Sequence, residues 1–246
     1  MEQLAWPDIQ AMVESGHRTA ILVAASIEQH GPHLACETDC WYGEEMALRV
    51  ARRLGDALVA PIIRPGCSEH HMGFPGTFSI PPALLVAVVK EHLRCLAASG
   101  LSHVILTSSH GGNFGPLRDS LPDLREHCSS LGVRLTPVLD LATFVEALTR
   151  APLARGLDQR MPAVQADLIE TSIVLALRPE TARMDLAEPG YLGEFDLDDL
   201  FRLGLKRITS NGVLGDPRLA TADLGKAILE SLETYLYDAV KAGGIP

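Results

Sequence analysis

The segment that decides the fold is RTAILVAASIEQHGPHLACETDCWYGEEMALRVARRLG, residues 18–55. It opens with RTAILVAAS (18–26), an apolar run of strand length that predicts a buried strand. It closes with CWYGEEMALRVARRLG (40–55), whose apolar residues repeat on one face and predict a helix. A buried strand that leads into a helix is the repeating unit of parallel sheets, so this segment already favours an α/β protein.

The alternation of strand and helix continues along the chain. Apolar runs bounded by turn-forming residues predict three further strands, at 57–66, 101–109 and 133–141. Helical patterns follow at 80–100, 116–132, 163–179 and 221–244, and an acidic, turn-rich stretch lies at 185–208. This order predicts a mainly parallel sheet with helices on both faces. Since no linker and no internal repeat interrupts it, we expect one domain over residues 1–246.

Composition and charge narrow the class of protein. The chain has 246 residues, a formal net charge of -10 and a pI near 5.3, so it lacks the basic surface that nucleic acids and anionic membranes require. Its N-terminus does not have the basic-then-apolar order of a signal peptide, and no apolar run is long enough to cross a bilayer. The five cysteines form no CxxC pair and suit a reducing compartment. We therefore expect a cytoplasmic protein that binds a small-molecule substrate rather than nucleic acid or membrane.

Polar segments follow each of the first three predicted strands. They are SIEQHGPHLACETDC (26–40), GCSEHHMGFPGTFS (66–79) and SSHGGNFGP (108–116). The carboxyl ends of parallel strands meet at one edge of a sheet, and ligands collect there. We therefore expect the three segments to form a single site.

Candidate metal-binding side chains lie in these segments and beyond them. Glu28 and His30 are two residues apart, so in an extended segment their side chains point the same way. The glycine and proline that follow can turn the chain and bring Asp39 back to the same place. His110 ends the third strand, and the two glycines after it let the backbone approach closely. Glu170 lies in an otherwise apolar helix, where a buried carboxylate needs a cation or hydrogen-bond donors.

Each of these residues also has an ordinary structural explanation. An isolated glutamate is more often a hydrogen-bond acceptor, Asp39 can cap the following helix, and HGGN can be a tight turn. Their coincidence at one edge of the sheet favours a metal site, and oxygen and nitrogen ligands suit Zn, Mn, Fe or Co. Cys36 and Cys40 lack a partner pair at the spacing of a structural zinc site. Three carboxylates and two imidazoles exceed what one tetrahedral ion needs, and a carboxylate such as Asp39 can bridge two divalent ions.

These segments resemble the creatininase family of metal-dependent amidohydrolases. The resemblance lies in SIEQHGPHLACETD, EHHMGFPGTFSI, SSHGGNFGPL, IETS and NGVLGDPRLATADLG, which follow the family's order from residue 26 to residue 225. It implies a three-layer α/β/α sandwich around the mainly parallel sheet, a divalent metal centre and a homo-oligomer, often a hexamer. The family's metal ligands correspond here to Glu28, His30, Asp39 and His110, with Glu170 of the ETS segment as a further ligand.

The same resemblance implies pocket residues and departures from the family pattern. His33 of HGPH and His71 before MGFPGT are expected to line the pocket. Gln165 stands where many relatives have a histidine that shuttles protons or holds the substrate, so a proton for the leaving nitrogen would come from His71, His33 or Glu69. Creatininases place a glutamate ligand at the position of Gly112 and tryptophans in their substrate loops, so creatinine is not the expected substrate.

The leading hypothesis is a metal-dependent hydrolase in which a metal-bound hydroxide cleaves a C–N bond of a small cyclic amide or formamide-type substrate. One alternative keeps the metal site and hydrolyses a C–C or ester bond in a cyclic sugar- or polyol-derived ketone, because substrate choice lies in the loops. A second alternative is a catalytically impaired paralogue that acts as a binding or assembly subunit. The presence of all five candidate ligands argues against this last hypothesis.

Overall fold

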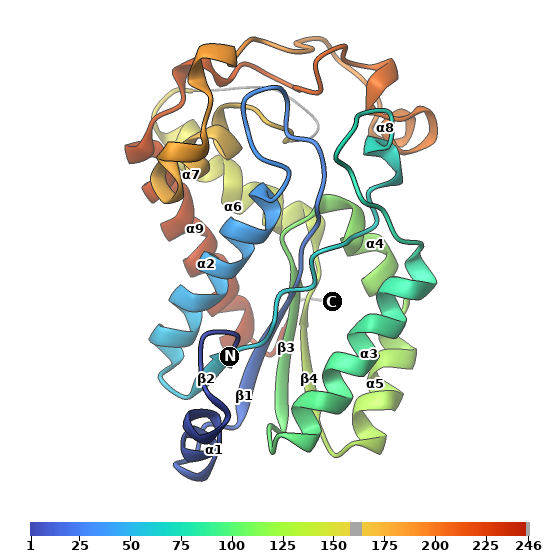
Figure 1. The fold of residues 1–246 in the computed structure, drawn as a ribbon, viewed down its shortest axis with the longest axis vertical. Helices are drawn as coiled ribbons and strands as arrows, with labels where there is room; N and C mark the ends of the chain where they lie inside the picture. The colour runs from blue at the N-terminus through green and yellow to red at the C-terminus, as the bar shows by residue number, and fades with distance from the viewer. Residues whose placement is uncertain (158–163, 245–246) are drawn as a thin grey trace.

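The computed structural model describes residues 1–157 and 164–244. Its centre is a sheet of four parallel strands in the order β2-β1-β3-β4 (Figure 1). The strands are β1 (Thr19–Ala24), β2 (Ala57–Val59), β3 (His103–Ser108) and β4 (Arg134–Val138). Every residue of β1 is buried, as expected for an apolar run in the middle of a parallel sheet that is covered on both faces.

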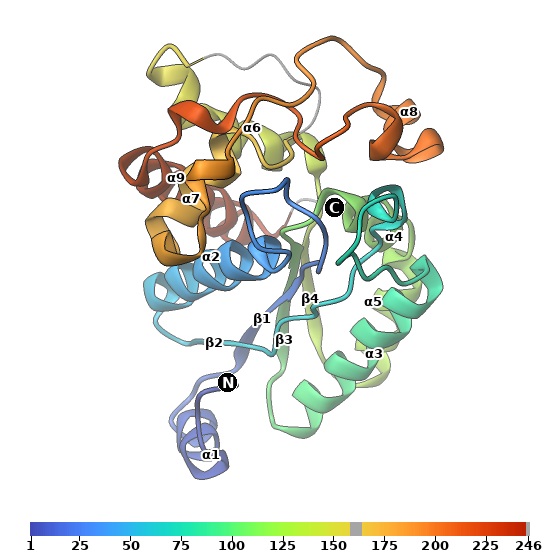
Figure 2. The ribbon, with the colours of Figure 1, turned by 45° about the horizontal axis from the view of Figure 1, so that its top comes forward.

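Helices cover both faces of the sheet and give the expected three layers (Figures 1 and 2). One layer contains α2 (Thr38–Leu54), α6 (Leu141–Ala154), α7 (Leu168–Leu177) and α9 (Ala222–Lys241). The other contains α3 (Pro82–Ala98), α4 (Gly111–Asp119) and α5 (Leu121–Ser130). Side chains of β1 alternate between the two layers: Ile21 and Val23 join the core of the first, whereas Leu22 joins the core of the second. The α/β class and the mainly parallel sheet are confirmed.

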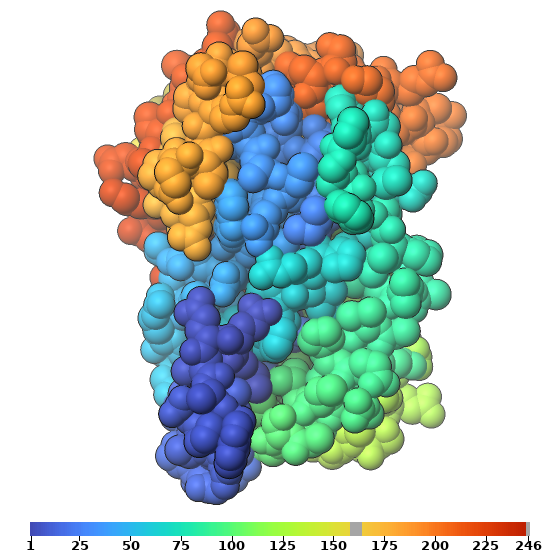
Figure 3. Space-filling view, in the orientation of Figure 1, coloured from blue at the N-terminus to red at the C-terminus, as the bar shows by residue number. Residues whose placement is uncertain are grey.

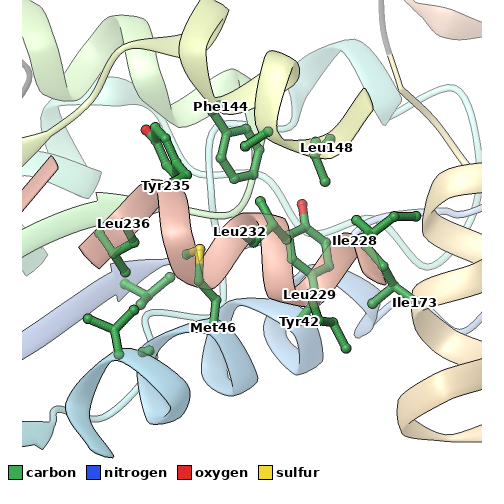
Figure 4. Packing of buried hydrophobic residues seen from close by; sticks show 14 of the residues in the cluster. Tyr42, Met46, Phe144, Leu148, Ile173, Ile228, Leu229, Leu232, Tyr235 and Leu236 are labelled. Carbon is green, nitrogen blue, oxygen red and sulfur yellow. The ribbon is translucent and has the colours of Figure 1, made fainter. Parts of the chain in front are cut away.

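The core of the first layer is built around α9. Figure 4 shows Leu229, Leu232 and Leu236 of this helix between Met46 of α2 and Phe144 of α6. All of these side chains are buried, and α9 packs against α7 as well as α2 and α6. Such close packing holds the first turns of α2 and α7 in fixed positions, which a metal site at the carboxyl edge of the sheet requires.

Three expectations about single elements differ from the structure. The strand expected at 57–66 is only three residues long, Ala57–Val59. Pro61 and Pro65 have no backbone N–H to donate a hydrogen bond to the neighbouring strand. Beyond the strand, a single bridge between Ala24 and Ile63 continues the pairing. The helix expected at 116–132 corresponds to two helices, the end of α4 and the whole of α5. The second helix begins at Leu121 and has a proline in its first turn. The helix expected at 163–179 begins at Leu168, where Asp167 caps α7.

Three helices were not expected from the sequence. They are α1 (Trp6–Glu14), α6 and α8 (Leu197–Leu203). The last two begin at capping aspartates, since Asp140 accepts a hydrogen bond from the backbone of Thr143 and Asp196 accepts one from the backbone of Asp198. Figure 2 shows α8 above α4, at the carboxyl edge of the sheet. Within the described ranges, no helix is long and apolar enough to cross a membrane.

Candidate metal centre

The segment after β1 lies at the top of the sheet, flanked by chain segments from far along the sequence (Figure 3). Glu28 and His30, two residues apart in this segment, bring donor atoms within 4.8 Å of each other. Nδ1 of His30 lies 3.0 Å from the backbone oxygen of Glu28. A carbonyl can only accept, so Nδ1 carries the proton and Nε2 presents its lone pair to the site.

His110 is held in a matching way from the end of β3. Its Nε2 lies 3.2 Å from the backbone oxygen of Cys67, so this nitrogen donates and Nδ1 is the free acceptor. In many metal sites, a histidine ligand donates its other N–H to a carbonyl in this manner. Hydrogen bonds to backbone carbonyls therefore orient both histidines as metal ligands would be oriented.

Two sets of donor atoms meet at the carboxylate of Asp39. On one side, Nε2 of His30 lies 3.4 Å from Oδ1 of Asp39 and 3.6 Å from Oε2 of Glu170. On the other side, Nδ1 of His110 lies 3.3 Å from Oδ2 of Asp39 and 3.2 Å from Oε2 of Glu28. All five side chains are buried. The two oxygens of Asp39 thus face different sets of donor atoms, one that contains His30 and one that contains His110.

The spacing of these atoms fits cations better than direct hydrogen bonds. Charge-assisted hydrogen bonds would close to about 2.7–2.9 Å. Ligands about 2.0–2.2 Å from a tetrahedral ion are instead about 3.3–3.6 Å apart, which is close to the observed range. Three of the donor atoms, Oε2 of Glu28, Nε2 of His30 and Oδ2 of Asp39, are buried with no hydrogen-bond partner. Burial of a polar atom without a hydrogen-bond partner costs free energy, so these atoms indicate a bound group, such as a cation, that is not part of the chain.

Without cations, the cluster holds protons in their place. Burial would lower the pKa of His110, but the carboxylates of Glu28 and Asp39 raise it to about 9. Burial also acts against the charged form of His30, yet Glu170 and Asp39 raise its pKa well above the ordinary value. Burial would raise the pKa of Asp39, but the two histidines hold it at about 2. Burial raises the pKa of Glu28 to about 7.

Binding of a divalent cation is therefore expected to tighten as the pH rises from about 6 to about 9. The proton on His110, whose pKa is about 9, must leave before Nδ1 can bind an ion. Each proton released contributes about a tenfold increase in affinity per pH unit. Zinc affinity measured against a chelator at several pH values tests this, and calorimetry in buffers of different ionisation enthalpy counts the protons. An affinity that does not change over this range would rule out His110 as a ligand.

Asp39 reaches the cluster because the start of α2 packs closely against the end of β3. The hydroxyl of Ser109 donates to the backbone oxygen of Asp39 at 2.8 Å. A Cβ on Gly43, one turn along α2, would lie 2.5 Å from the Oγ atom of Ser109. Only glycine permits this approach, so Gly43 sets the position of the shared carboxylate.

Nearly the whole chain is similar in sequence to known proteins. A family model described as creatininase, creatinine amidohydrolase, matches residues 2–240. This chain belongs to the creatininase family. One relative is the creatinine amidohydrolase of Pseudomonas putida, which is 26% identical over 97% of this chain and 95% of its own length.

Other relatives in the creatininase family carry different names. A mycofactocin precursor peptide peptidase of Mycolicibacterium smegmatis is 29% identical over 90% of this chain and 83% of its own length. A 3-dehydro-scyllo-inosose hydrolase of Thermotoga maritima is 25% identical over 90% and 76%. The solved structure of a mutant creatininase of the Zn-Zn type superposes with a TM-score of 0.81 at 25% identity over 100% of this chain and 98% of that one. A manganese creatininase superposes with a TM-score of 0.75 at 26% identity over the same shares.

Position 112 has no room for a side chain. A Cβ on Gly112 would lie 2.3 Å from the backbone oxygen of Cys67 and 2.6 Å from Nε2 of His110. A glutamate therefore does not fit there in this structure. Glu170 brings its carboxylate to the cluster from the first turn of α7, and its Oε2 also accepts a hydrogen bond from the backbone of Ala166 at 2.5 Å.

Strain in the backbone accompanies that arrangement. Ala166 has a φ of 51°, the only positive value at a non-glycine residue within the described ranges. Such a conformation costs of order 1–3 kcal/mol and persists where the surrounding structure requires it. The adjacent Asp167 caps α7, because its side chain accepts hydrogen bonds from the amides of Ile169 and Glu170. These bonds fix the start of α7 directly after the strained residue. The strained turn aims the Ala166 amide at the carboxylate of Glu170.

The other predicted site residues lie around the cluster at different distances. His71 is buried, with Nε2 3.5 Å from Oε1 of Glu28, and it lines the pocket beside the cluster. Gln165 lines the same pocket and donates from Nε2 to the backbone oxygen of Gln29 at 2.8 Å. His33 is buried but does not line this pocket, and its Nε2 lies 2.9 Å from Oγ1 of Thr171. Glu69 is exposed and lines a neighbouring groove. The catalytic roles of these four residues stay predictions.

Tyr42 and His70 are among the pocket residues that were not predicted from the sequence. Tyr42 lines the pocket, and its hydroxyl donates to the backbone oxygen of Ser109. Its position three residues after Asp39 places it on the same face of α2, which was an available signal. His70 lines the pocket with its ring stacked on that of His110, and the centroids are 5.7 Å apart. Its signal was the doubled histidine of EHH, of which only the second member was considered.

Proposed function

We propose that this hydrolase cleaves amide C–N bonds with two divalent ions held by the five buried ligands. The observation that carries the proposal is the division of Asp39 between two sets of donors, one with His30 and Glu170 and the other with His110 and Glu28. A carboxylate shared between two ions is a common feature of binuclear hydrolases. Bound ions would lower the pKa of a coordinated water to about 7 and polarise the substrate carbonyl.

The side chains around the cluster support proton delivery by His71. The amide nitrogen of Gln29 lies 3.4 Å from Nδ1 of His71 and can only donate, so His71 holds its proton at Nε2, the atom that faces Glu28. The amide of Gln165 has no proton to release at neutral pH. His33 faces Thr171, and Glu69 lies outside the pocket. Of the predicted donors, only His71 presents an N–H to the pocket.

The relatives support an amide bond as the target and broaden the range of substrates. A creatinine amidohydrolase and a peptide peptidase both act on C–N bonds, as their names state, and one of them on a peptide. The limit to small, non-peptide amides that the sequence suggested is therefore not part of this proposal. Protein loaded with Zn or Mn and tested on blocked peptides, N-formyl amino acids and cyclic amides should hydrolyse at least one class. Full metal loading without any C–N cleavage would overturn the proposal.

A second candidate is hydrolysis of a C–C bond in a cyclic polyol-derived ketone. The 3-dehydro-scyllo-inosose hydrolase relative favours it, as does the replacement of the family histidine by Gln165. The apolar wall of the pocket opposes it, because a polyol would leave hydroxyl groups without partners there. Parallel assays on cyclic polyol ketones and amides separate the two candidates.

Glu170→Gln is expected to reduce the metal content from two ions per chain to about one and to lower kcat by about a hundredfold. It removes a charged ligand from the set that contains His30 and leaves the set of His110 and Glu28 complete. Elemental analysis of protein purified from defined metal medium measures the stoichiometry. Asp167→Asn is the matched control, because asparagine caps a helix as well as aspartate and the residue lies outside both sets. Retention of two ions by the Glu170 variant would exclude this carboxylate as a ligand.

A further inference from the structure

The pocket beside the cluster is walled by apolar side chains. Six of them, from α6, α8 and the segments that follow α8, are Phe144, Leu148, Leu197, Leu200, Leu205 and Leu214. Among the described residues that line it, no lysine or arginine is present. Its acidic side chains belong to the metal cluster, and His70, His71 and Gln165 add polar groups to the lining. A ligand group that packs against the apolar wall of this inner pocket must therefore be apolar and uncharged.

The inner pocket is small. It offers about 80 Å³ to a water-sized molecule. A single water needs about 10–15 Å³ by this measure, so the pocket has room for roughly five to eight groups of that size. This is the space of one amino-acid side chain rather than of a longer molecule.

A second and larger cavity opens next to the inner pocket. This outer groove has a volume of about 670 Å³, within the range of about 300–1,000 Å³ that is typical of ligand sites. Its lining is mainly apolar, and Glu69, Arg118 and Ser79 add one negative charge, one positive charge and a hydroxyl. Such a wall can contact the apolar side chains of a peptide as well as its peptide groups, which carry a donor and an acceptor at each residue.

His70 and Phe201 stand between the two cavities and line both. Their ring centroids are 4.7 Å apart. His70 is buried against the ligand His110, whereas Phe201, on α8, is 47% exposed. An exposed aromatic ring at the junction can contact a bound chain without supporting the core. Gly111 also lines both cavities, and a Cβ at this position would meet no atom within 4 Å.

We propose that the substrate is a peptide chain with an apolar side chain next to the cleaved bond. That side chain would fill the inner pocket, the cleaved bond would lie at the metal cluster, and the remainder of the chain would lie in the outer groove between Glu69 and Arg118. Phe201 would cover the chain where it passes from one cavity to the other. This inference rests on the proposed amide hydrolysis and adds the substrate class and the residue that selects it.

The test uses the metal-loaded protein and blocked tetrapeptides that differ at one position, acetyl-Ala-Xaa-Ala-Ala-amide. Leucine or phenylalanine at Xaa should give a kcat/KM at least about tenfold above serine or lysine, because a site of this kind discriminates by the contacts of one side chain. Creatinine and dihydrouracil should be poorer substrates than the leucine peptide. Phe201→Ala should lower kcat/KM for the leucine peptide about tenfold, whereas Leu203→Ala, equally exposed on α8 and lining neither cavity, should not change it.

A binding measurement separates this inference from the proposed function. A ketomethylene analogue of the leucine peptide cannot be hydrolysed, and calorimetry on the metal-loaded protein should show it binding at least about tenfold more tightly than its lysine counterpart. Its binding should also have a negative heat capacity change, the mark of apolar burial. Tight, leucine-selective binding without hydrolysis of any amide would support the inference and overturn the proposed function. Equal binding of the two analogues, or amide hydrolysis restricted to small cyclic compounds, would overturn the inference alone.

Discussion

Asp39→Asn is expected to remove most of the bound metal and to lower kcat/KM by on the order of a thousandfold or more. The two oxygens of Asp39 face the two candidate histidine ligands, His30 and His110, so its loss weakens both sets of donors. Asparagine keeps the shape of the side chain but loses the charge that offsets a cation. Elemental analysis and kinetics on the same preparation measure the two effects together, and far-ultraviolet circular dichroism checks that the variant is folded.

Glu37→Gln is the matched control for this prediction. Glu37 begins the same helix two residues earlier, and its carboxylate accepts from the exposed side chain of Arg64 instead of facing the cluster. An exposed ion pair of this kind contributes about 0–1 kcal/mol, so the control should keep both metal and activity. An Asp39 variant with normal metal content and activity would contradict the assignment of the shared carboxylate.

Gly112→Ala is expected to destabilise the protein by about 1–3 kcal/mol and to weaken metal binding about 10–100-fold. The new methyl group would lie 2.3 Å from the Cys67 carbonyl and 2.6 Å from Nε2 of His110, and neither atom is at the end of a flexible side chain. Relief of this contact must disturb the hydrogen bond from Nε2 to that carbonyl, which orients the ring of His110. Thermal unfolding and zinc affinity at fixed pH measure the two consequences.

Gly115→Ala provides the comparison for stability and metal content. Gly115 lies within the same helix, α4, where a Cβ would meet no atom within 4 Å. Alanine is favoured over glycine inside a helix by about 1 kcal/mol, so this variant should be as stable as the parent or more stable, with unchanged metal affinity. If the Gly112 variant behaved in the same way, the account of the closed position beside His110 would be wrong.

The fold was predictable to the extent that local patterns decide it. Four strands were expected in order because their apolar runs are long enough to be recognised and are buried on both faces. The second strand was overestimated because its apolar residues continue past Pro61, and hydrophobicity does not show where ladder bonding ends. Helix α6 was not predicted although Asp140 is an N-cap signal, because Asp140 was included in the strand predicted at 133–141, which ends at Val138 in the structure.

The cluster was predictable in its members but not in its geometry. Glu28, His30 and Asp39 bring donor atoms within 4.8 Å of one another, as their place after β1 led us to expect. The roles of His33 and Glu69 could not be judged from sequence, because their motif places them beside the ligands while the fold turns them toward Thr171 and the outer groove. The predicted homo-oligomer stays a prediction.

The sequence by itself determined which residue types stand at the carboxyl edge of the sheet, since strand periodicity and the order of strands are local properties of the chain. Only the tertiary structure decided how their atoms pair. It divides Asp39 between His30 and His110, closes position 112 with the Cys67 carbonyl and brings in Glu170 from α7. The physical reason is that periodicity gives directions, whereas ligand pairing and pocket shape depend on distances of a few ångströms between segments that only packing brings together.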